Sequence, residues 1–178
     1  ESSALIPVKS DTIYEISAFY SSKNCDPTAT LRFDVFQYDE NGNPLYDSSG
    51  NKLTIVGTKV SLSGASVADE WKKIYTRVSA ANKNVRYISF AFLVSPGRAN
   101  VWIDDVAVTE VENEDGSVVI TDKNDFHAVD SDGNLSGWML EKTKGNSSLA
   151  RVEGEDGYRG KLTVDGGATA KISTKIKS

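Results

Sequence analysis

The chain has 178 residues, of which 39% are hydrophobic and 25% are charged, and its formal net charge is -5. These values are ordinary for a folded domain and exclude a disordered tail, and no apolar run is long enough to cross a bilayer. The basic residues are scattered among the acids, so nucleic acid is not an expected partner. One cysteine, Cys25, and one histidine, His127, provide no disulfide, no multi-cysteine metal cage and no spacing that indicates a catalytic triad.

Strand patterns dominate the first part of the chain. Runs rich in β-branched and aromatic residues, most of them alternating with polar ones, end in turn residues such as Gly, Pro, Asn, Asp or Ser. They predict strands at 12–20, 30–38, 52–62, 71–78, 85–94 and 101–111. DENGN (39–43) and DSSGN (47–51) flank Pro44, Leu45 and Tyr46 and predict a projecting hairpin or loop.

The second part continues with shorter strand patterns, at 117–120, 137–142, 147–154, 161–164 and 169–177. Many short strands separated by turns are typical of an all-β sandwich or barrel. The acidic segment ENEDG (112–116) interrupts two apolar runs and is the best candidate linker. DSDGN (130–134) resembles the start of an EF-hand loop, but its flanks read as strands, so we expect an ordinary turn there.

Several segments carry a resemblance to one group of β-sandwich modules. VWIDDVAVTEV (101–111) resembles the closing strand of carbohydrate-binding modules of families 4, 9, 16 and 22, and IPVKSDTIYEISAFYSS (6–22) and WKKIYTRVSA (71–80) look like strands that precede it. VITDKNDFHAVDSDGNLSGWMLEK (119–142) and GYRGKLTVDGG (157–167) resemble the opening part of the same modules. The resemblance implies a jelly-roll β-sandwich in which a start-like half follows an end-like half.

Two domain maps account for the inverted order. In the favoured map, residues 1–178 form a single, circularly permuted sandwich, built from 1–111 as the family's C-terminal part and 117–178 as its N-terminal part. In the alternative, two partial modules are split near 112–116, which would leave open sheet edges and unpaired apolar faces. Similar segments at the two ends, IPVKS (6–10) and TKIKS (174–178), favour the permuted map, because permutation requires termini that lie close together.

The resemblance implies a non-catalytic carbohydrate-binding module that holds the catalytic domain of a bacterial, secreted or cell-surface polysaccharide-degrading enzyme near its glycan. The acidic net charge favours a neutral, β-linked polysaccharide or oligosaccharide as the ligand. Neither enzymatic activity nor a membrane partner is expected. The alternative function is a structural spacer or a protein-interaction sandwich in a multidomain surface protein. The sequence does not open with an export-signal pattern, so we expect such a signal to be removed or to lie outside these residues.

Sugar binding requires flat aromatic faces with planar polar groups beside them. Alternation along TLRFDVFQY (30–38) separates one side with Phe33 and Gln37 from another that mixes aromatic and hydrogen-bonding groups. We predict carbohydrate binding by Tyr38, Arg32, Asp34, Phe36, Tyr87, Gln37, Tyr20, Trp102 and Tyr46. Trp71 and Trp138 match family positions that pack internally, so we expect both in the core, together with Phe33, Phe90 and Phe92.

Asp104 and Asp105 could be taken as paired catalytic acids, but adjacent strand residues point to opposite faces and cannot line one cleft. In the resembled modules the Ile-Asp-Asp-Val strand supplies a calcium ligand beside the opening segment. The resemblance therefore implies one structural Ca²⁺, with Asp104 as first ligand, Asp105 as second, and Asn124 and Asp125 from the opening segment. His127 departs from this pattern, since the family has Glu there and an imidazole is a poor calcium ligand.

Overall fold

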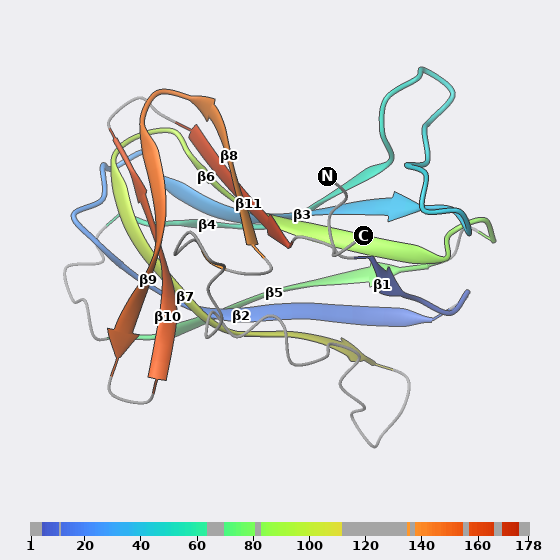
Figure 1. The fold of residues 1–178 in the computed structure, drawn as a ribbon, viewed down its shortest axis with the longest axis horizontal. Coiled ribbons are helices and arrows are strands. Elements are labelled where there is room, and N and C mark those ends of the chain that lie inside the picture. Colours follow the sequence, from blue (N-terminus) through green and yellow to red (C-terminus); the bar gives the residue numbers. More distant parts are fainter. Residues whose placement is uncertain are drawn as a thin grey trace.

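The computed structural model describes residues 5–10, 12–63, 70–80, 83–111, 135, 138–154, 157–165 and 169–174. These residues form two antiparallel sheets that pack face to face, and they contain no helix. Figure 1 shows β3, β4 and β6 in one layer and β2 and β5 in the other. The predicted all-β sandwich is confirmed.

Sheet I has the strand order β4-β3-β6-β11-β8, and β1 also pairs with β6. Its strands are β1 (Ile6–Pro7), β3 (Thr30–Tyr38), β4 (Thr54–Ser61), β6 (Tyr87–Ser95), β8 (Trp138–Lys144) and β11 (Thr169–Thr174). Sheet II has the order β5-β2-β7-β10-β9. Its strands are β2 (Ile13–Lys23), β5 (Lys72–Ser79), β7 (Ala99–Glu110), β9 (Ser147–Gly154) and β10 (Gly157–Val164).

The strand predictions differ from the structure mainly at the ends of the strands. β3 and β9 have the predicted bounds, whereas β2 runs on to Lys23 and β10 begins at Gly157. The strand expected at 117–120, the linker at 112–116 and the turn at 130–134 lie outside the described residues.

The core lies between the two sheets and contains rings from both parts of the chain. Phe33, Phe90 and Phe92 are fully buried, and Trp138 is 2% exposed. The ring centroid of Trp138 lies 6.0 Å from that of Phe92 and 6.4 Å from that of Phe90. All four rings occupy the core as expected, and burying such side chains is a main source of stability.

Strands from either side of the 112–116 segment also pair with one another in each sheet, β11 with β6 and β10 with β7. β1 and β11 share one edge of β6, where Ile6 pairs with Ile88 and Ala170 pairs with Val94. The first and last described strands therefore lie along the same neighbour. Circular permutation of the family order stays a prediction.

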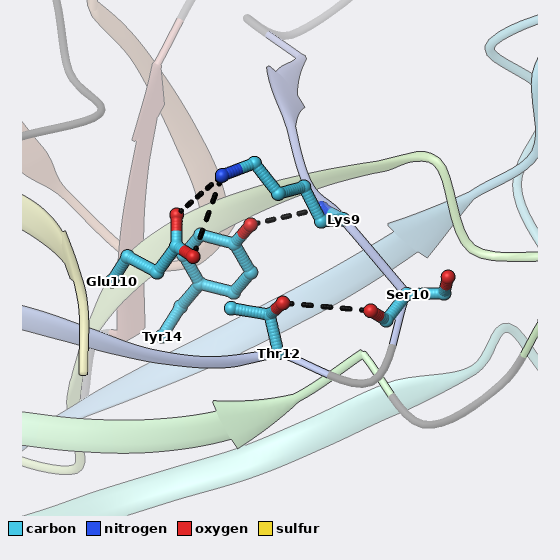
Figure 2. Close-up of polar contacts among 5 residues, drawn as sticks. All are labelled: Lys9, Ser10, Thr12, Tyr14 and Glu110. Atoms are coloured by element: carbon cyan, nitrogen blue, oxygen red, sulfur yellow. Dashed lines mark hydrogen bonds and ion pairs between the residues drawn. The ribbon is translucent and has the colours of Figure 1, made fainter. Parts of the chain in front are cut away.

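Beyond β1 the chain crosses from sheet I to sheet II, and a small polar cluster fixes the crossing (Figure 2). The Lys9 backbone N–H donates to the Tyr14 hydroxyl at 2.9 Å, and the Lys9 ammonium lies 3.1 Å from a carboxylate oxygen of Glu110. The Thr12 hydroxyl donates to the backbone carbonyl of Ser10 at 3.4 Å. The Lys9 side chain is 71% exposed but that of Glu110 only 9%, so water screens this ion pair from the lysine side alone, and the contact ties the segment to β7.

The segment 39–53 projects from the end of β3, away from sheet II (Figure 1). It contains two turns of the same design eight residues apart. Asp39 accepts backbone hydrogen bonds from Asn41 and Asn43, and Asp47 accepts them from Ser49 and Asn51. These hydrogen bonds lower the pKa of both carboxyl groups. Such Asx turns explain why the two D-x-x-G-N motifs form a projecting hairpin.

Candidate functional site

The outer face of sheet I carries five of the predicted sugar-binding residues. Arg32, Asp34, Phe36 and Tyr38 alternate along β3 with the buried Leu31, Phe33 and Val35, so their side chains point away from the core. On the neighbouring β6, Tyr87 pairs with Tyr38, Ser89 with Phe36 and Ala91 with Asp34. We call this set, Arg32, Asp34, Phe36, Tyr38, Tyr87 and Ser89, the β3–β6 face.

Polar contacts hold the planar groups of the β3–β6 face in fixed orientations. Two guanidinium nitrogens of Arg32 donate to the two carboxylate oxygens of Asp34, at 2.8 and 2.9 Å. Asp34 is only 8% exposed, so this bidentate pair is poorly screened by water. The Tyr38 and Ser89 hydroxyl groups lie 3.0 Å apart. Both carboxylate oxygens of Asp34 are therefore engaged by Arg32.

Small residues of β6 lie beneath the larger side chains of this face. Ser89 and Ala91 are small and almost fully buried, at 1% and 0% exposed. The Lys171 ammonium, from β11, lies 4.6 Å from the Phe36 ring centroid, a cation–π distance. Tyr46, in the projecting hairpin, is 55% exposed. The face thus combines aromatic rings and hydrogen-bonding groups, which are the groups that contact sugars in binding sites.

Three other predicted residues lie elsewhere. Tyr20 is a core residue at 8% exposed, on the same side of β2 as Tyr14 and Ile16, and burial raises the pKa of its hydroxyl. Gln37 pairs with the buried Ile88, on the side of sheet I that faces the core, and is half-buried. Both positions correct the prediction, because neither residue belongs to the outer face.

Trp102 points to the outer face of sheet II, where the Lys161 ammonium lies 5.0 Å from its ring centroid. Trp71 was expected in the core, but it is half-buried and its ring faces Arg159, whose guanidinium carbon lies 4.8 Å from the ring centroid. The alternation of the following residues could have indicated the outward position of Trp71. Ile74, Thr76 and Val78 form the buried side of this segment. The odd-numbered residues, Trp71 included, then face outward.

The predicted calcium ligands are only partly described. Asp104 lies 3.4 Å from the guanidinium of Arg159 and accepts the backbone N–H of Asp105 at 3.0 Å. Burial raises the pKa of Asp104. Asp105 is exposed and has a φ of 48°, because a bulge interrupts the alternation of β7 at this point. Asn124 and Asp125 lie outside the described residues.

Around Asp104 the described residues place a basic group and no second acidic side chain other than Asp105. No group of three or more acidic, histidine or cysteine residues gathers within the described part of the chain. The Arg159 guanidinium occupies the position beside Asp104 that a cation would take. A calcium ion at Asp104 would therefore require Arg159 to turn away and the opening segment to supply further oxygens.

No protein-family model matches the chain, and no curated protein matches it. Within the described ranges, no helix is long and apolar enough to cross a membrane.

Proposed function

We propose that the chain is a non-catalytic carbohydrate-binding module, which directs a secreted or cell-surface polysaccharide-degrading enzyme to its glycan. The observation that carries the proposal is the β3–β6 face, where Phe36, Tyr38 and Tyr87 lie beside the fixed planar pair of Arg32 and Asp34. Aromatic rings stack on the apolar face of a pyranose, while guanidinium and carboxylate groups bind its hydroxyls.

The proposed ligand is a neutral, β-linked polysaccharide. Arg32 and Asp34 cancel each other's charge, and Tyr38 and Ser89 offer uncharged hydroxyl groups. A face of this kind favours hydroxyl groups over a strongly charged polymer. Binding by such a face would concentrate an attached catalytic domain at its substrate without any chemical step in this chain.

The second candidate is a structural spacer or protein-interaction sandwich. Two contacts favour it: the Lys171 ammonium covers one side of the Phe36 ring, and Arg32 and Asp34 already satisfy each other. A ligand would have to displace the lysine and share the ion pair.

Isothermal titration with soluble β-glucan, xylan and mannan tests the proposal. We expect at least one of them to bind, and Phe36→Ala and Tyr87→Ala to weaken that binding about tenfold, as loss of an aromatic binding contact does. Val111→Ala is the control, because Val111 is 37% exposed beyond the end of β7 and lies outside the β3–β6 face. Failure of the folded protein to bind any of the three glycans would favour the spacer. Release of reducing ends from a bound glycan would overturn the non-catalytic assignment.

We also propose one structural Ca²⁺ held by Asp104, with Asp105, Asn124 and Asp125 as further ligands. The supporting observation is that Asp104 is a half-buried carboxylate whose pKa burial raises, so a cation beside it would relieve the cost of its charge. The ion would stabilise the fold and take no part in sugar binding.

A further inference from the structure

The outer face of sheet II, on the opposite side of the molecule from the β3–β6 face, presents aromatic rings beside basic groups. Trp102 pairs with Ser21 on one side and with Lys161 on the other. Trp71 directly precedes β5. Because Lys72 of β5 pairs with Tyr20, Trp71 lies beside Ser21 on the side of β2 that faces β5, opposite to Trp102. Ser21 is only 1% exposed although it faces outward, which shows that neighbouring side chains cover it.

Each of three rings on this face has a cation beside it. Arg159 lies 4.8 Å from the Trp71 ring centroid, Lys161 lies 5.0 Å from that of Trp102, and Lys73 lies 5.8 Å from that of Tyr75. These are cation–π distances, and such contacts hold a long basic side chain flat along an aromatic ring. The cations are therefore positioned at the surface beside the rings.

Two further apolar side chains remain in water on the same face. Phe19, which pairs with Lys73 and Asp104, is 38% exposed, and Tyr75, which pairs with Ser17, is 49% exposed. Contiguous exposed aromatic groups mark binding surfaces more often than single exposed ones do.

The charge of this face opposes that of the whole chain. Its central ionic groups, taken from the described residues, are four cations and two carboxylates: Lys73, Arg77, Arg159, Lys161, Glu15 and Asp104. Four minus two gives +2, whereas the chain carries -5, so the remaining residues together carry -7.

The two carboxylates do not neutralise the basic groups one for one. Glu15 accepts hydrogen bonds from Lys73 and Arg77, and these bonds lower its pKa although burial acts in the opposite direction. Asp104 pairs with Arg159. Of these two acids, Glu15 thus pairs with basic residues of β5 and Asp104 pairs with Arg159. Neither of them pairs with Lys161, whose ammonium lies beside Trp102 and can bind a negatively charged ligand.

We propose that this surface, centred on Trp102 and Lys161, is a second binding site whose ligand is an acidic polysaccharide built from uronic acids. A uronic acid residue has a carboxylate that the Lys161 ammonium can bind and an apolar ring face that can stack on the Trp102 indole. Because Lys161 lies over the Trp102 ring, its ammonium must turn from the indole to the carboxylate as the sugar ring takes its place. A neutral glycan would gain nothing from the cations. The site is separate from the β3–β6 face and does not depend on the function proposed for it.

Titration with oligogalacturonates and with alginate oligosaccharides in low-salt buffer tests the proposal. We expect binding to at least one of them. Lys161→Gln should weaken it about tenfold because the charge-assisted hydrogen bond to the carboxylate is lost, and Trp102→Ala should weaken it about tenfold because the stacking surface is lost. Lys59→Gln is the matched control: Lys59 is an exposed lysine on β4 of sheet I, and its loss should leave binding unchanged.

Three results would overturn the inference: no binding of either uronate by the folded wild type, an equal loss in Lys59→Gln, or equally tight binding of a single-stranded DNA oligonucleotide, which would indicate a generic response to polyanions. Phe36→Ala separates the two proposals. It should weaken neutral-glycan binding and leave uronate binding intact. A wild-type protein that binds a uronate but none of the three neutral glycans would contradict the proposed function alone.

Discussion

At Asp104 a carboxylate, a guanidinium and a β-bulge meet on the outer side of β7. The bulge arises because β2 and β7 shift register between Ser17 and Phe19, and Asp105 takes up the extra residue with a positive φ. Asp104 lies 3.4 Å from Arg159, which partly offsets the cost of burying its charge.

Calcium should raise the melting temperature of the protein, and Asp104→Ala should abolish that effect. An ion bound only by the native state stabilises it through mass action, by about 2.7 kcal/mol when free calcium is about a hundred times its dissociation constant. Asp165→Ala is the control, since Asp165 is exposed at the end of β10. The melting temperature of each variant is measured in chelator and in excess calcium. A wild-type melting temperature that is the same in both would rule out the site.

Single residues show where alternation is informative and where a family match misleads. Tyr20 follows the alternation of β2, on the same side as the buried Tyr14 and Ile16. Trp71, directly before β5, continues the alternation of that strand on the side opposite the buried Ile74. Alternation alone would have placed both correctly, because the pleat fixes the side of each residue. Only tertiary packing decides that Lys171 lies on Phe36 and Arg159 on Trp71, since these contacts join strands distant in sequence.

At the scale of elements, β4 and β5 are edge strands of opposite sheets that approach each other at Gly57. A Cβ atom at Gly57 would lie 2.7 Å from the Thr76 hydroxyl oxygen and 2.9 Å from the Phe33 backbone oxygen. Thr76 in turn accepts the backbone N–H of Thr58 at 2.7 Å. The edge strands β4 and β5 are therefore in contact at Gly57, where any residue larger than glycine would have to displace neighbouring atoms.

Gly57→Ala should lower the free energy of unfolding by about 1 to 3 kcal/mol, the usual cost of overpacking, because backbone as well as side-chain atoms would have to move. Urea denaturation measures the change. Ser61→Ala, an exposed substitution on the same strand, is the control and should be nearly neutral. A loss below about 0.5 kcal/mol in Gly57→Ala would mean that the edges separate easily.

Strand positions could be predicted where composition and turn residues define them, as for β3, whose bounds match the prediction. The β-bulges could not be predicted, because they depend on how the strands pair with one another. β4 shifts register against β3 between Arg32 and Asp34, and β7 shifts against β2 near Asp104. The expectation that Asp104 and Asp105 simply point to opposite faces missed the second shift.

At the scale of the whole molecule, the two parts of the chain meet in one aromatic cluster. Trp138 packs against Phe90 and Phe92, and β11 and β10 complete the pairing of β6 and β7. Residues 1–111 alone would leave those two strands with unpaired edges.

Trp138→Ala should lower the free energy of unfolding by about 3 to 5 kcal/mol while the protein still unfolds in one transition. Differential scanning calorimetry would measure both. Tyr46→Ala, at an exposed ring, should have little effect. Two separate transitions in the wild type would contradict a shared core and favour the map with two partial modules.

The placement of β1 and β11 on β6 has a mechanical consequence. Both strands run in the same direction along one edge, so the end of β11 at Thr174 faces the start of β1 at Ile6. A pull applied through these two ends would load the hydrogen bonds nearest the gap first, and each strand would peel from β6 one bond at a time instead of shearing. Force spectroscopy should therefore show the terminal strands detaching at low force before sheet II yields, whereas a single high-force rupture would indicate that the load is shared along the whole edge.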